Sequence, residues 1–401
     1  MASRKGNRIN GRPAHIAHVG PGYLQLPAMS GGAVERRMVE LAVAQAQVFG
    51  IRAVVYSRGG FREELQHHGI VVRRLPAKRL LPRALAFSYR CVQDLRELRP
   101  LILHVHGRPE VAWLARRAGL RTPIVLSCDY YLEPLHAVGA VRPIVKGAWR
   151  AALRCADVIA PVSQYCLSMW EAYWGLPRAR LSVLPNGVNL EQFRPSPGEA
   201  AAWRRRLAVG NSLMMLYVGR VCSQKGVDLL PGALRLVRQE FPDAVLVVAG
   251  PPERFGRTGS NSVIAELAAA GARYVPPVDD AELPGLYSAC DVFVMPTRNF
   301  EMFGMAAVEA QACGRPVVAS DHGGLTETVP ASAGLRFRVG DSRDLGEKIL
   351  LLLKRPDLRR ELGEGALRNA AQYEWGRIAQ TSGSIYANVM GSERWEEARS
   401  R

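Results

Sequence analysis

Short runs of apolar and β-branched residues recur along the first half of the chain, and stretches with helical spacing of their apolar positions separate them. An apolar run of about four to eight residues bounded by turn residues is typical of a buried strand. The predicted strands of this half are residues 15–19, 51–56, 70–75, 101–106, 123–127 and 158–160. Because strands alternate with helices, the pattern predicts a parallel sheet with helices on both faces.

The same alternation begins again further along the chain. The predicted strands of the second half are residues 213–219, 244–249, 273–275, 291–295, 316–319 and 334–337, and residues from 341 onward are predicted to be helical. Turn residues 185–188 and the two prolines within 194–198 favour a linker there. We therefore predict two doubly wound α/β domains, residues 1–195 and 196–372, followed by a helical segment, residues 373–401.

The length and composition agree with this division. A chain of 401 residues with 48% hydrophobic residues is too long for one ordinary core. No apolar run approaches the roughly 18 residues of a membrane span, and residues 1–12 lack the apolar centre of a signal peptide. We therefore expect a cytoplasmic protein. The seven cysteines form no Cys-x-x-Cys pair, so we expect reduced and mostly buried thiols, with neither a zinc site nor a disulfide framework.

The net charge of +17 is concentrated in the first half. Residues 1–200 contain 28 Lys and Arg against 13 Asp and Glu, whereas residues 201–401 contain 25 against 23. This asymmetry favours a polyanionic partner or an anionic membrane surface, although a GC-rich genome that uses arginine freely produces the same bias. Within this half, residues 73–99 form a basic and amphipathic segment that fits either a lipid surface or packing of its apolar stripe on the sheet.

Two glutamates stand out in the second half. Glu301 and Glu309 are eight residues apart, which on one continuous helix would place them about 80° out of register. We therefore expect Glu301 on a loop and Glu309 on a helix that opens near Gly304 and stops at Gly314, so that both reach one ligand. Gly304 allows a close approach of the backbone, and free N–H groups at the helix N-terminus favour an anion.

Two cations and two glycines are candidates for phosphate binding. Arg220 and Lys225 follow the strand predicted at 213–219 and precede a helix predicted at 227–240. At the carboxyl end of a strand such a pair can hold a diphosphate and stabilise its negative charge. Gly31 and Gly32 open a helix that reaches residue 49, where backbone N–H groups are accessible to a phosphate; a simple turn is the alternative.

Three more candidates follow strands of the first half. His106 ends the strand predicted at 101–106, and Asp129 and Tyr130 follow the strand at 123–127. Ligands of open parallel sheets gather at the carboxyl ends of strands, so these side chains can contact a substrate. A helix N-cap is the alternative role for Asp129.

Five short motifs follow one another along the chain. They are Gly31-Gly32, Pro185 to Asn189, Val218-Gly219-Arg220 with Lys225-Gly226, the Glu301-x7-Glu309 pair, and Gly323-Gly324 with Glu327. This set resembles the retaining glycosyltransferases of family 4. The resemblance implies the GT-B fold, in which two Rossmann-like domains face a central cleft. It also implies that the first domain binds the acceptor, that the second binds the nucleotide sugar, and that residues 373–401 cross back to the first domain.

The resemblance also assigns roles. Arg220, Lys225 and Glu301 would be catalytic; Gly31, Gly32, Val278, Phe303, Gly304, Met305 and Glu309 would bind the donor; His106, Asp129 and Tyr130 would bind the acceptor. Within these sets, Glu309 would contact the ribose, Glu301 the sugar hydroxyls, and residues around Val278 the base. One departure is Cys128, which stands where family members often have histidine.

The resulting hypothesis is a retaining, metal-independent glycosyltransferase that needs no cofactor and uses a nucleotide sugar, with a UDP-sugar preferred. Its acceptor would be a hydroxyl of a glycan, a lipid-linked molecule or a secondary metabolite, with peripheral contact to the inner face of an anionic membrane and no nucleic acid partner. Two alternatives stay open: a glycosidase that uses Glu301 and Glu309, and a non-catalytic scaffold that binds membrane or polyanion. A sugar-nucleotide epimerase shares the architecture but lacks the ordered motifs.

Overall fold

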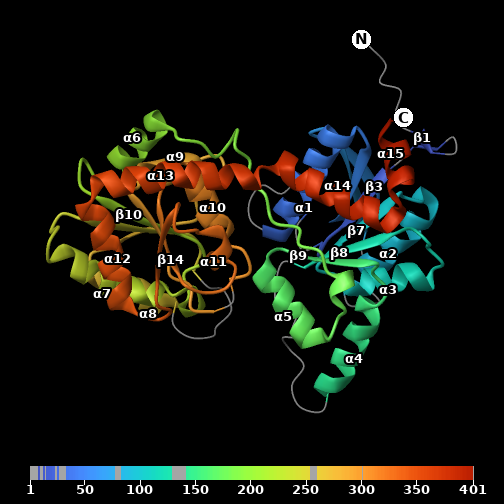
Figure 1. Cartoon of the computed structure of the whole chain (residues 1–401), viewed down its shortest axis with the longest axis horizontal. Helices are drawn as coiled ribbons and strands as arrows, with labels where there is room; N and C mark the ends of the chain where they lie inside the picture. The colour runs from blue at the N-terminus through green and yellow to red at the C-terminus, as the bar shows by residue number, and fades with distance from the viewer. Residues whose placement is uncertain are drawn as a thin grey trace, which may run out of the picture. The chain divides into compact units, whose positions relative to one another are not determined.

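The chain forms two compact α/β units (Figure 1). The computed structural model describes residues 8–9, 12–13, 15–22, 25–26, 33–76, 83–128, 141–252, 260–299 and 301–400. Unit 1 consists of Met1–Gly187 together with Trp375–Arg401, and unit 2 consists of Val188–Glu374. The linker therefore falls at the turn that contains Gly187, slightly before the boundary predicted at residue 195.

Unit 1 is built on a seven-stranded sheet with the order β5-β6-β4-β3-β7-β8-β9. Its strands are β3 (His15–Val19), β4 (Arg52–Gly59), β5 (Glu63–His67), β6 (Ile70–Pro76), β7 (Ile102–His106), β8 (Ile124–Cys128) and β9 (Val158–Pro161). All neighbours are parallel except β5, which pairs antiparallel with β6. The strand order reverses between β3 and β7, which makes the sheet doubly wound.

The helices of unit 1 include two from the C-terminal end of the chain. The helices of this unit are α1 (Ala33–Phe49), α2 (Arg83–Leu98), α3 (Pro109–Arg117), α4 (Val141–Leu153), α5 (Gln164–Trp174), α14 (Trp375–Met390) and α15 (Ser392–Ser400). The unit also contains an antiparallel pair of short strands, β1 (Arg8–Ile9) and β2 (Arg12–Pro13). Tyr386 of α14 and Trp395 of α15 share one buried hydrophobic cluster with Leu41 and Phe49 of α1. This apolar burial attaches the C-terminal segment to the first unit.

Unit 2 contains a six-stranded parallel sheet with the order β12-β11-β10-β13-β14-β15. The strands are β10 (Met214–Val218), β11 (Val245–Ala249), β12 (Arg273–Val275), β13 (Val292–Met295), β14 (Val317–Ser320) and β15 (Gly334–Phe337). The helices are α6 (Pro197–Arg206), α7 (Leu230–Arg238), α8 (Ser260–Ala269), α9 (Leu283–Ala289), α10 (Met305–Ala312), α11 (Leu325–Thr328), α12 (Ser342–Lys354) and α13 (Pro356–Ala370). The order reverses between β10 and β13, so this sheet is doubly wound as well.

The predicted amphipathic segment 73–99 is not one continuous element. Its first residues belong to β6, where Arg73 pairs with the carboxylates of Glu64 and Asp94 rather than facing a lipid surface. Residues 77–82 lie outside the described part of the chain, and α2 follows. Among the described residues, no helix has both the length and the apolar character to cross a bilayer.

Candidate active site

The predicted charged residues of unit 2 cluster where its sheet changes direction. β10 and β13 are parallel neighbours, so the loops that follow them leave the sheet at the same edge. Lys225 belongs to the loop after β10, in the short 3₁₀ helix η2 (Ser223–Lys225), and Glu301 belongs to the loop after β13. The crevice outside the carboxyl ends of strands at such a reversal is where open α/β sheets bind ligands.

Lys225 and Glu301 form a direct ion pair across these two loops. Nζ of Lys225 donates to Oε2 of Glu301 at 2.5 Å, and the two side chains are 26% and 15% exposed. The backbone of Gly226 makes this approach geometrically feasible. Its φ is +68°, and a Cβ at this position would lie 1.7 Å from the carbonyl oxygen of Pro296, so a larger residue would push the loops apart.

The loop that carries Glu301 packs against two glycines, Gly323 and Gly324, which follow β14. The N–H of Gly324 donates to the carbonyl oxygen of Glu301 at 2.7 Å, and a Cβ on Gly324 would lie 2.1 Å from the carbonyl oxygen of Met302. The hydroxyl of Thr328 donates to the carbonyl oxygen of Phe303 at 2.8 Å. Gly323 and Gly324 thus act through packing, because the loop after β14 must contact the loop that carries Glu301 closely.

Glu309 lies on α10, as the spacing predicted, whereas Glu301 lies on the preceding loop. Gly304, with a φ of +90°, precedes the first residue of α10. The side chain of Glu309 is buried, and the hydroxyl of Tyr287 on α9 donates to its Oε2 at 2.9 Å. This bond fixes the position of one carboxylate oxygen.

Arg220 is exposed on the same loop as Lys225, and its carbonyl oxygen accepts a hydrogen bond from the hydroxyl of Tyr217 at 2.8 Å. Burial raises the pKa of Tyr217 well above its usual value, the charges of Cys222 and Glu301 raise that pKa further, and Arg220 lowers it. Arg220 and Lys225 share the loop after β10, so together with Glu301 they form the group of charged residues at this strand reversal.

The remaining donor-site candidates of unit 2 lie on its loops and on α10. Val278 is half-buried after β12, and Met305 is half-buried at the start of α10. Phe303 is buried and packs edge-on against Tyr373, with ring centroids 5.3 Å apart. Four predicted site residues, Gly31, Gly32, Asp129 and Tyr130, lie outside the described part of the chain.

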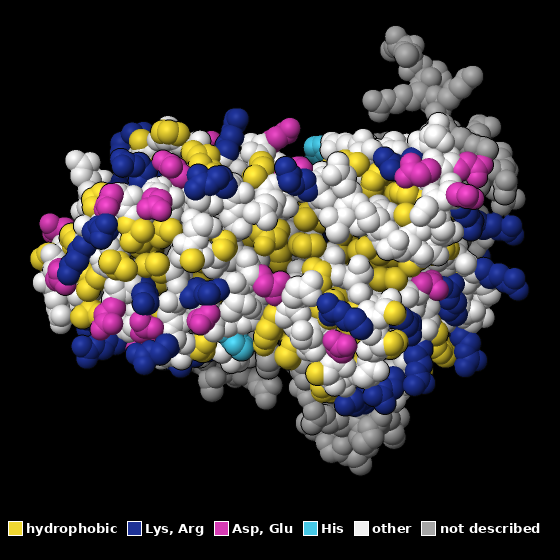
Figure 2. Space-filling view, in the orientation of Figure 1, with side chains coloured by type: hydrophobic (Ala, Val, Ile, Leu, Met, Phe, Trp, Pro, Cys, Tyr) yellow, Lys and Arg dark blue, Asp and Glu magenta, His cyan; other side chains and the backbone are white. Residues whose placement is uncertain are grey.

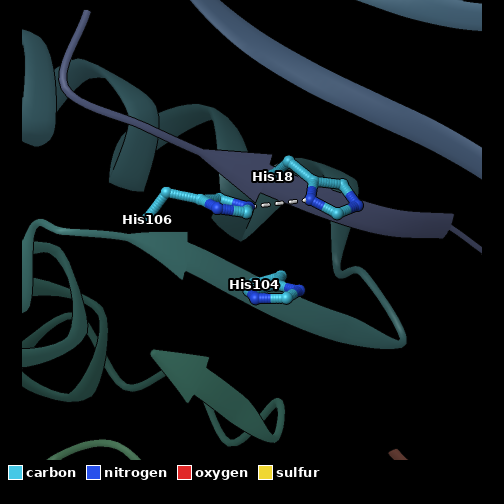
Figure 3. Close-up of side chains that lie close together, drawn as sticks. All are labelled: His18, His104 and His106. Atoms are coloured by element: carbon cyan, nitrogen blue, oxygen red, sulfur yellow. Dashed lines mark hydrogen bonds between the residues drawn. The ribbon is translucent and has the colours of Figure 1, made fainter. Parts of the chain in front are cut away.

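In unit 1, His106 is fully buried within a group of three histidines (Figure 3). His18 on β3 lies beside His104 and His106 on β7, at the strand reversal of this sheet. The rings stack, with centroids 4.4 to 5.4 Å apart. The sequence indicated His106 alone. Its contact with His18 arises because β3 and β7, which are far apart in the chain, are neighbours in the sheet.

The hydrogen bonds around this group determine which ring nitrogens carry protons. The hydroxyl of Ser382 donates to the carbonyl oxygen of Ala379, so it accepts from Nε2 of Gln45, at 2.7 Å. Oε1 of Gln45 therefore faces His18 and accepts from its Nε2–H at 2.9 Å. Nδ1 of His18 is then an acceptor, and Nε2–H of His106 donates to it at 3.1 Å.

The third ring is bound on both sides. Nδ1 of His104 accepts from the hydroxyl of Tyr386 at 2.6 Å, and its Nε2–H donates to the hydroxyl of Ser127 at 2.7 Å. Burial lowers the pKa of His18 to about 3 and lowers those of His104 and His106 well below the usual value. All three rings are therefore neutral near pH 7.

Nδ1 of His106 is the one ring nitrogen of this group without a hydrogen-bond partner among the described residues. A metal ion ligated by all three rings would have to displace two hydrogen bonds, one at His18 and one at His104. Among the described residues, the three rings are therefore joined to Gln45, Ser127 and Tyr386 in one hydrogen-bonded network.

Cys128 is also fully buried, and its thiol donates to the carbonyl oxygen of Leu126 at 3.7 Å. Its side chain is thus engaged with its own strand. All seven cysteines are free thiols, and six of them are buried; the sequence predicted mostly buried cysteines. Burial raises the pKa of Cys290 and of Cys313 to about 12, which keeps both protonated.

Comparison with known proteins identifies the class. The model of Glycosyltransferase Family 4 matches residues 30–192, and that of Glycosyl transferases group 1 matches residues 200–368. The chain belongs to the glycosyltransferase family that these two models describe, as the motifs predicted. Its two Rossmann-like units are those of the GT-B fold.

Two curated proteins are similar to about half of this chain. The chain is 33% identical over 235 residues to a D-inositol 3-phosphate glycosyltransferase of Streptomyces bingchenggensis, covering 55% of this chain and 50% of the relative. It is 36% identical over 226 residues to a GDP-mannose-dependent alpha-(1-6)-phosphatidylinositol monomannoside mannosyltransferase of Mycolicibacterium smegmatis, covering 54% and 56%. The chain thus spans about half the length of these curated relatives.

Solved structures share the fold over nearly the whole chain. Anabaena HepE in complex with UDP superposes with a TM-score of 0.74 at 19% identity, covering 93% of this chain and 99% of HepE. At this level of identity the likeness concerns the architecture alone.

Proposed function

We propose that the protein is a retaining, metal-independent glycosyltransferase that moves a sugar from a nucleotide sugar to a hydroxyl group of an acceptor. The observation that carries this proposal is the ion pair of Lys225 and Glu301 at the strand reversal of unit 2, with Arg220 on the same loop as Lys225. A sugar nucleotide contains both groups that this cluster can bind: a diphosphate for the cations and sugar hydroxyls for the carboxylate.

The reaction would proceed as follows. The bond between the sugar C1 and the diphosphate oxygen breaks, and the bond between C1 and the acceptor oxygen forms on the same face of the sugar. The acceptor's proton passes to the leaving diphosphate. Arg220 and Lys225 would stabilise the negative charge that accumulates on the diphosphate, a task that a divalent metal performs in other enzymes.

The other donor contacts follow from the same loops. Glu309 would accept from the ribose hydroxyls with a carboxylate that Tyr287 holds in place. Glu301 and the backbone of Phe303 to Met305 would bind the sugar hydroxyls, Val278 would lie by the base, and Gly31 and Gly32 would approach the diphosphate. Since one relative is named for GDP-mannose and HepE was solved with UDP, uridine and guanosine donors are the first to test.

For the acceptor we propose a glycan or lipid-linked hydroxyl, with inositol-containing molecules tested first because both named relatives carry inositol in their names. His106, Asp129 and Tyr130 would contact this acceptor.

The direct test is transfer with UDP-glucose, GDP-mannose and related donors, in the presence of EDTA, with the anomeric configuration of the product read by NMR. Retained configuration and undiminished rates in EDTA support the proposal. Inverted product, or activity that returns only with added divalent metal, contradicts it.

The two alternatives make different predictions for the same assay. A glycosidase based on Glu301 and Glu309 would cleave glycosides that carry no nucleotide, and it would give Arg220 and Lys225 no role. A non-catalytic scaffold would release no nucleotide from any donor, with or without acceptor. The direct pairing of Lys225 with Glu301 favours transfer, because a glycosidase mechanism has no use for a cation at this carboxylate.

Peripheral contact with the inner face of an anionic membrane is part of this proposal. Leu85 and Tyr89, one turn apart on α2, are 43% and 48% exposed, and Trp113 on the neighbouring α3 is 37% exposed, with the guanidinium of Arg117 5.0 Å from the centre of its ring. Basic side chains lie around this side of unit 1 (Figure 2). Flotation with vesicles that contain phosphatidylglycerol should recover the wild type and lose the Leu85→Ser, Tyr89→Ser variant; equal recovery of both would contradict the contact.

A further inference from the structure

A cationic cavity lies in unit 1, at the edge of the sheet opposite to His106. It has a volume of about 480 Å³ and sits at the amino ends of β7 and β8, because Leu101 precedes β7 and Pro123 precedes β8. Four arginines line it, namely Arg96, Arg99, Arg121 and Arg394. No acidic residue is among the lining residues.

The four arginines come from three separate segments that the fold brings together. Arg96 and Arg99 lie at the end of α2, Arg121 lies on the loop between α3 and β8, and Arg394 lies on α15. The position of α15 is fixed by its neighbouring residue Trp395, which is buried in the same hydrophobic cluster as Leu101. Apolar packing, rather than attraction between charges, therefore places Arg394 beside the other three.

These guanidinium groups are exposed, and no described carboxylate pairs with any of them. Other arginines of the protein have such partners, as Arg73 has Asp94 and Arg298 has Asp228. Four like charges around one cavity repel one another, so the arrangement costs stability unless an anion is bound.

The backbone conformation at Arg99 also supports a role for this arginine. Arg99 follows the last residue of α2 with a φ of +47°, in the left-handed region that usually ends a helix with glycine or asparagine. For a residue with a Cβ this conformation is unfavourable. The fold thus holds Arg99, which lines the cavity, in a strained backbone conformation.

We propose that this cavity binds a small anion with two or more phosphate groups, at a site distinct from the transfer site. The planar guanidinium group forms paired hydrogen bonds with phosphate oxygens, and four of them from three directions suit an anion with several phosphates better than a single one. The cavity volume lies within the usual range for small-molecule sites.

The site is remote from the substrate edge of the same sheet. His106 ends β7 at its carboxyl end, and the five residues of that strand separate the two edges by about 16 Å. A bound anion would connect α15 with α2 and the edge of the sheet. It would thus stabilise the attachment of the C-terminal helix to unit 1.

The test uses inorganic pyrophosphate and the full chain at low ionic strength. Because pyrophosphate can also bind at Arg220 and Lys225, titration calorimetry is performed in the Lys225→Ala background. We expect one remaining site per chain, weakened about tenfold or more by Arg121→Gln with Arg394→Gln, and left intact by Arg343→Gln, a change of an exposed arginine of unit 2. Hydrogen exchange of α15 should slow when pyrophosphate is added, and only when both Arg121 and Arg394 are present.

Equal binding of pyrophosphate by the double variant and by its Lys225→Ala parent would overturn the proposal. So would binding confined to anionic vesicles or to nucleic acid, or an affinity for monophosphate equal to that for pyrophosphate. The Gln substitutions also provide an internal check on folding: without anion, they relieve repulsion and should leave the melting temperature unchanged or higher.

Discussion

Nζ of Lys225 lies 2.5 Å from Oε2 of Glu301, although the two residues are 76 positions apart and follow different strands. The contact exists because β10 and β13 are neighbours in the sheet while the chain between them forms β11 and β12. In the absence of substrate, the charge of each side chain is compensated by the opposite charge of the other. A bound diphosphate would replace Glu301 as the partner of Lys225 and release the carboxylate toward the sugar.

Replacing Glu301 by Gln should lower transfer strongly. The amide keeps the shape of the side chain but removes its charge, so both its bond to Lys225 and its bonds to sugar hydroxyls weaken. We expect kcat to fall by about 10²-fold or more, as for loss of one group that stabilises a transition state. Glu347→Gln is the matched control, because Glu347 also pairs with a cation but lies exposed on α12. Wild-type kcat in Glu301→Gln would refute the role of the carboxylate.

The Tyr287→Phe variant tests the hydrogen bond that the Tyr287 hydroxyl donates to Glu309. Removing the hydroxyl leaves a buried carboxylate with one fewer donor, which should lower the free energy of unfolding by about 1–3 kcal/mol. If Glu309 holds the ribose, the KM for the donor should rise as well. Tyr274→Phe, which removes a hydroxyl bonded to the carbonyl oxygen of Gly250, is the control for loss of a hydrogen bond elsewhere in unit 2. An unchanged donor KM in Tyr287→Phe would separate stability from function.

Gly324→Ala tests the packing beneath the Glu301 loop. The added Cβ would lie 2.1 Å from the carbonyl oxygen of Met302, and that atom belongs to backbone, which cannot rotate away. We expect transfer to fall by about tenfold or more as the loop shifts. Gly198→Ala is the control, since a Cβ there meets no atom within 4 Å and the residue lies in α6. It should be neutral or slightly stabilising. Equal activity of both variants would show that the loop tolerates displacement.

The three buried histidines predict a loss of stability in acid. Burial lowers their pKa values in the folded protein, so below about pH 6.5 the unfolded chain binds more protons than the folded chain. The free energy of unfolding should therefore fall as pH drops from about 6.5 toward 3, by up to about 1.4 kcal/mol per pH unit for each histidine. Hydrogen exchange of the β3 and β7 amides at several pH values measures this slope.

A variant pair makes the histidine prediction specific. His106→Phe should make the slope shallower, because one proton-binding group is lost. His68→Asn should not, because His68 is exposed and asparagine tolerates its φ of +44°. Identical slopes in the two variants would show that the acid sensitivity arises elsewhere.

The sequence predicted the strands of both sheets because each is a short apolar run. It missed β5, whose polar side chains alternate between partly buried and exposed on a sheet edge, so they lack a hydrophobic pattern. It also extended one helix from 227 to 240, whereas a short 3₁₀ helix, η3 (Val227–Leu229), precedes α7. Pro231 at the start of α7 marks that boundary.

For the site, the sequence predicted residues but not their partners. Spacing alone placed Glu301 on a loop and Glu309 on a helix, since eight residues do not fit one helix face. The bond from Tyr287 to Glu309 and the network from Gln45 through His18 to His106 could not be predicted, because each joins residues from separate elements. Such contacts depend on tertiary packing, which leaves no local pattern in a single sequence.

Binding of the donor nucleotide by the Lys225→Ala variant tests the central claim most directly. Titration calorimetry compares the wild type, Lys225→Ala and Lys348→Ala, with whichever of UDP and GDP the wild type binds more tightly; Lys348 is an exposed lysine that pairs with Asp344 on α12. We predict a dissociation constant at least about tenfold higher for Lys225→Ala and an unchanged value for Lys348→Ala. Wild-type affinity in a folded Lys225→Ala protein would contradict the claim that this lysine and Glu301 meet on one sugar nucleotide.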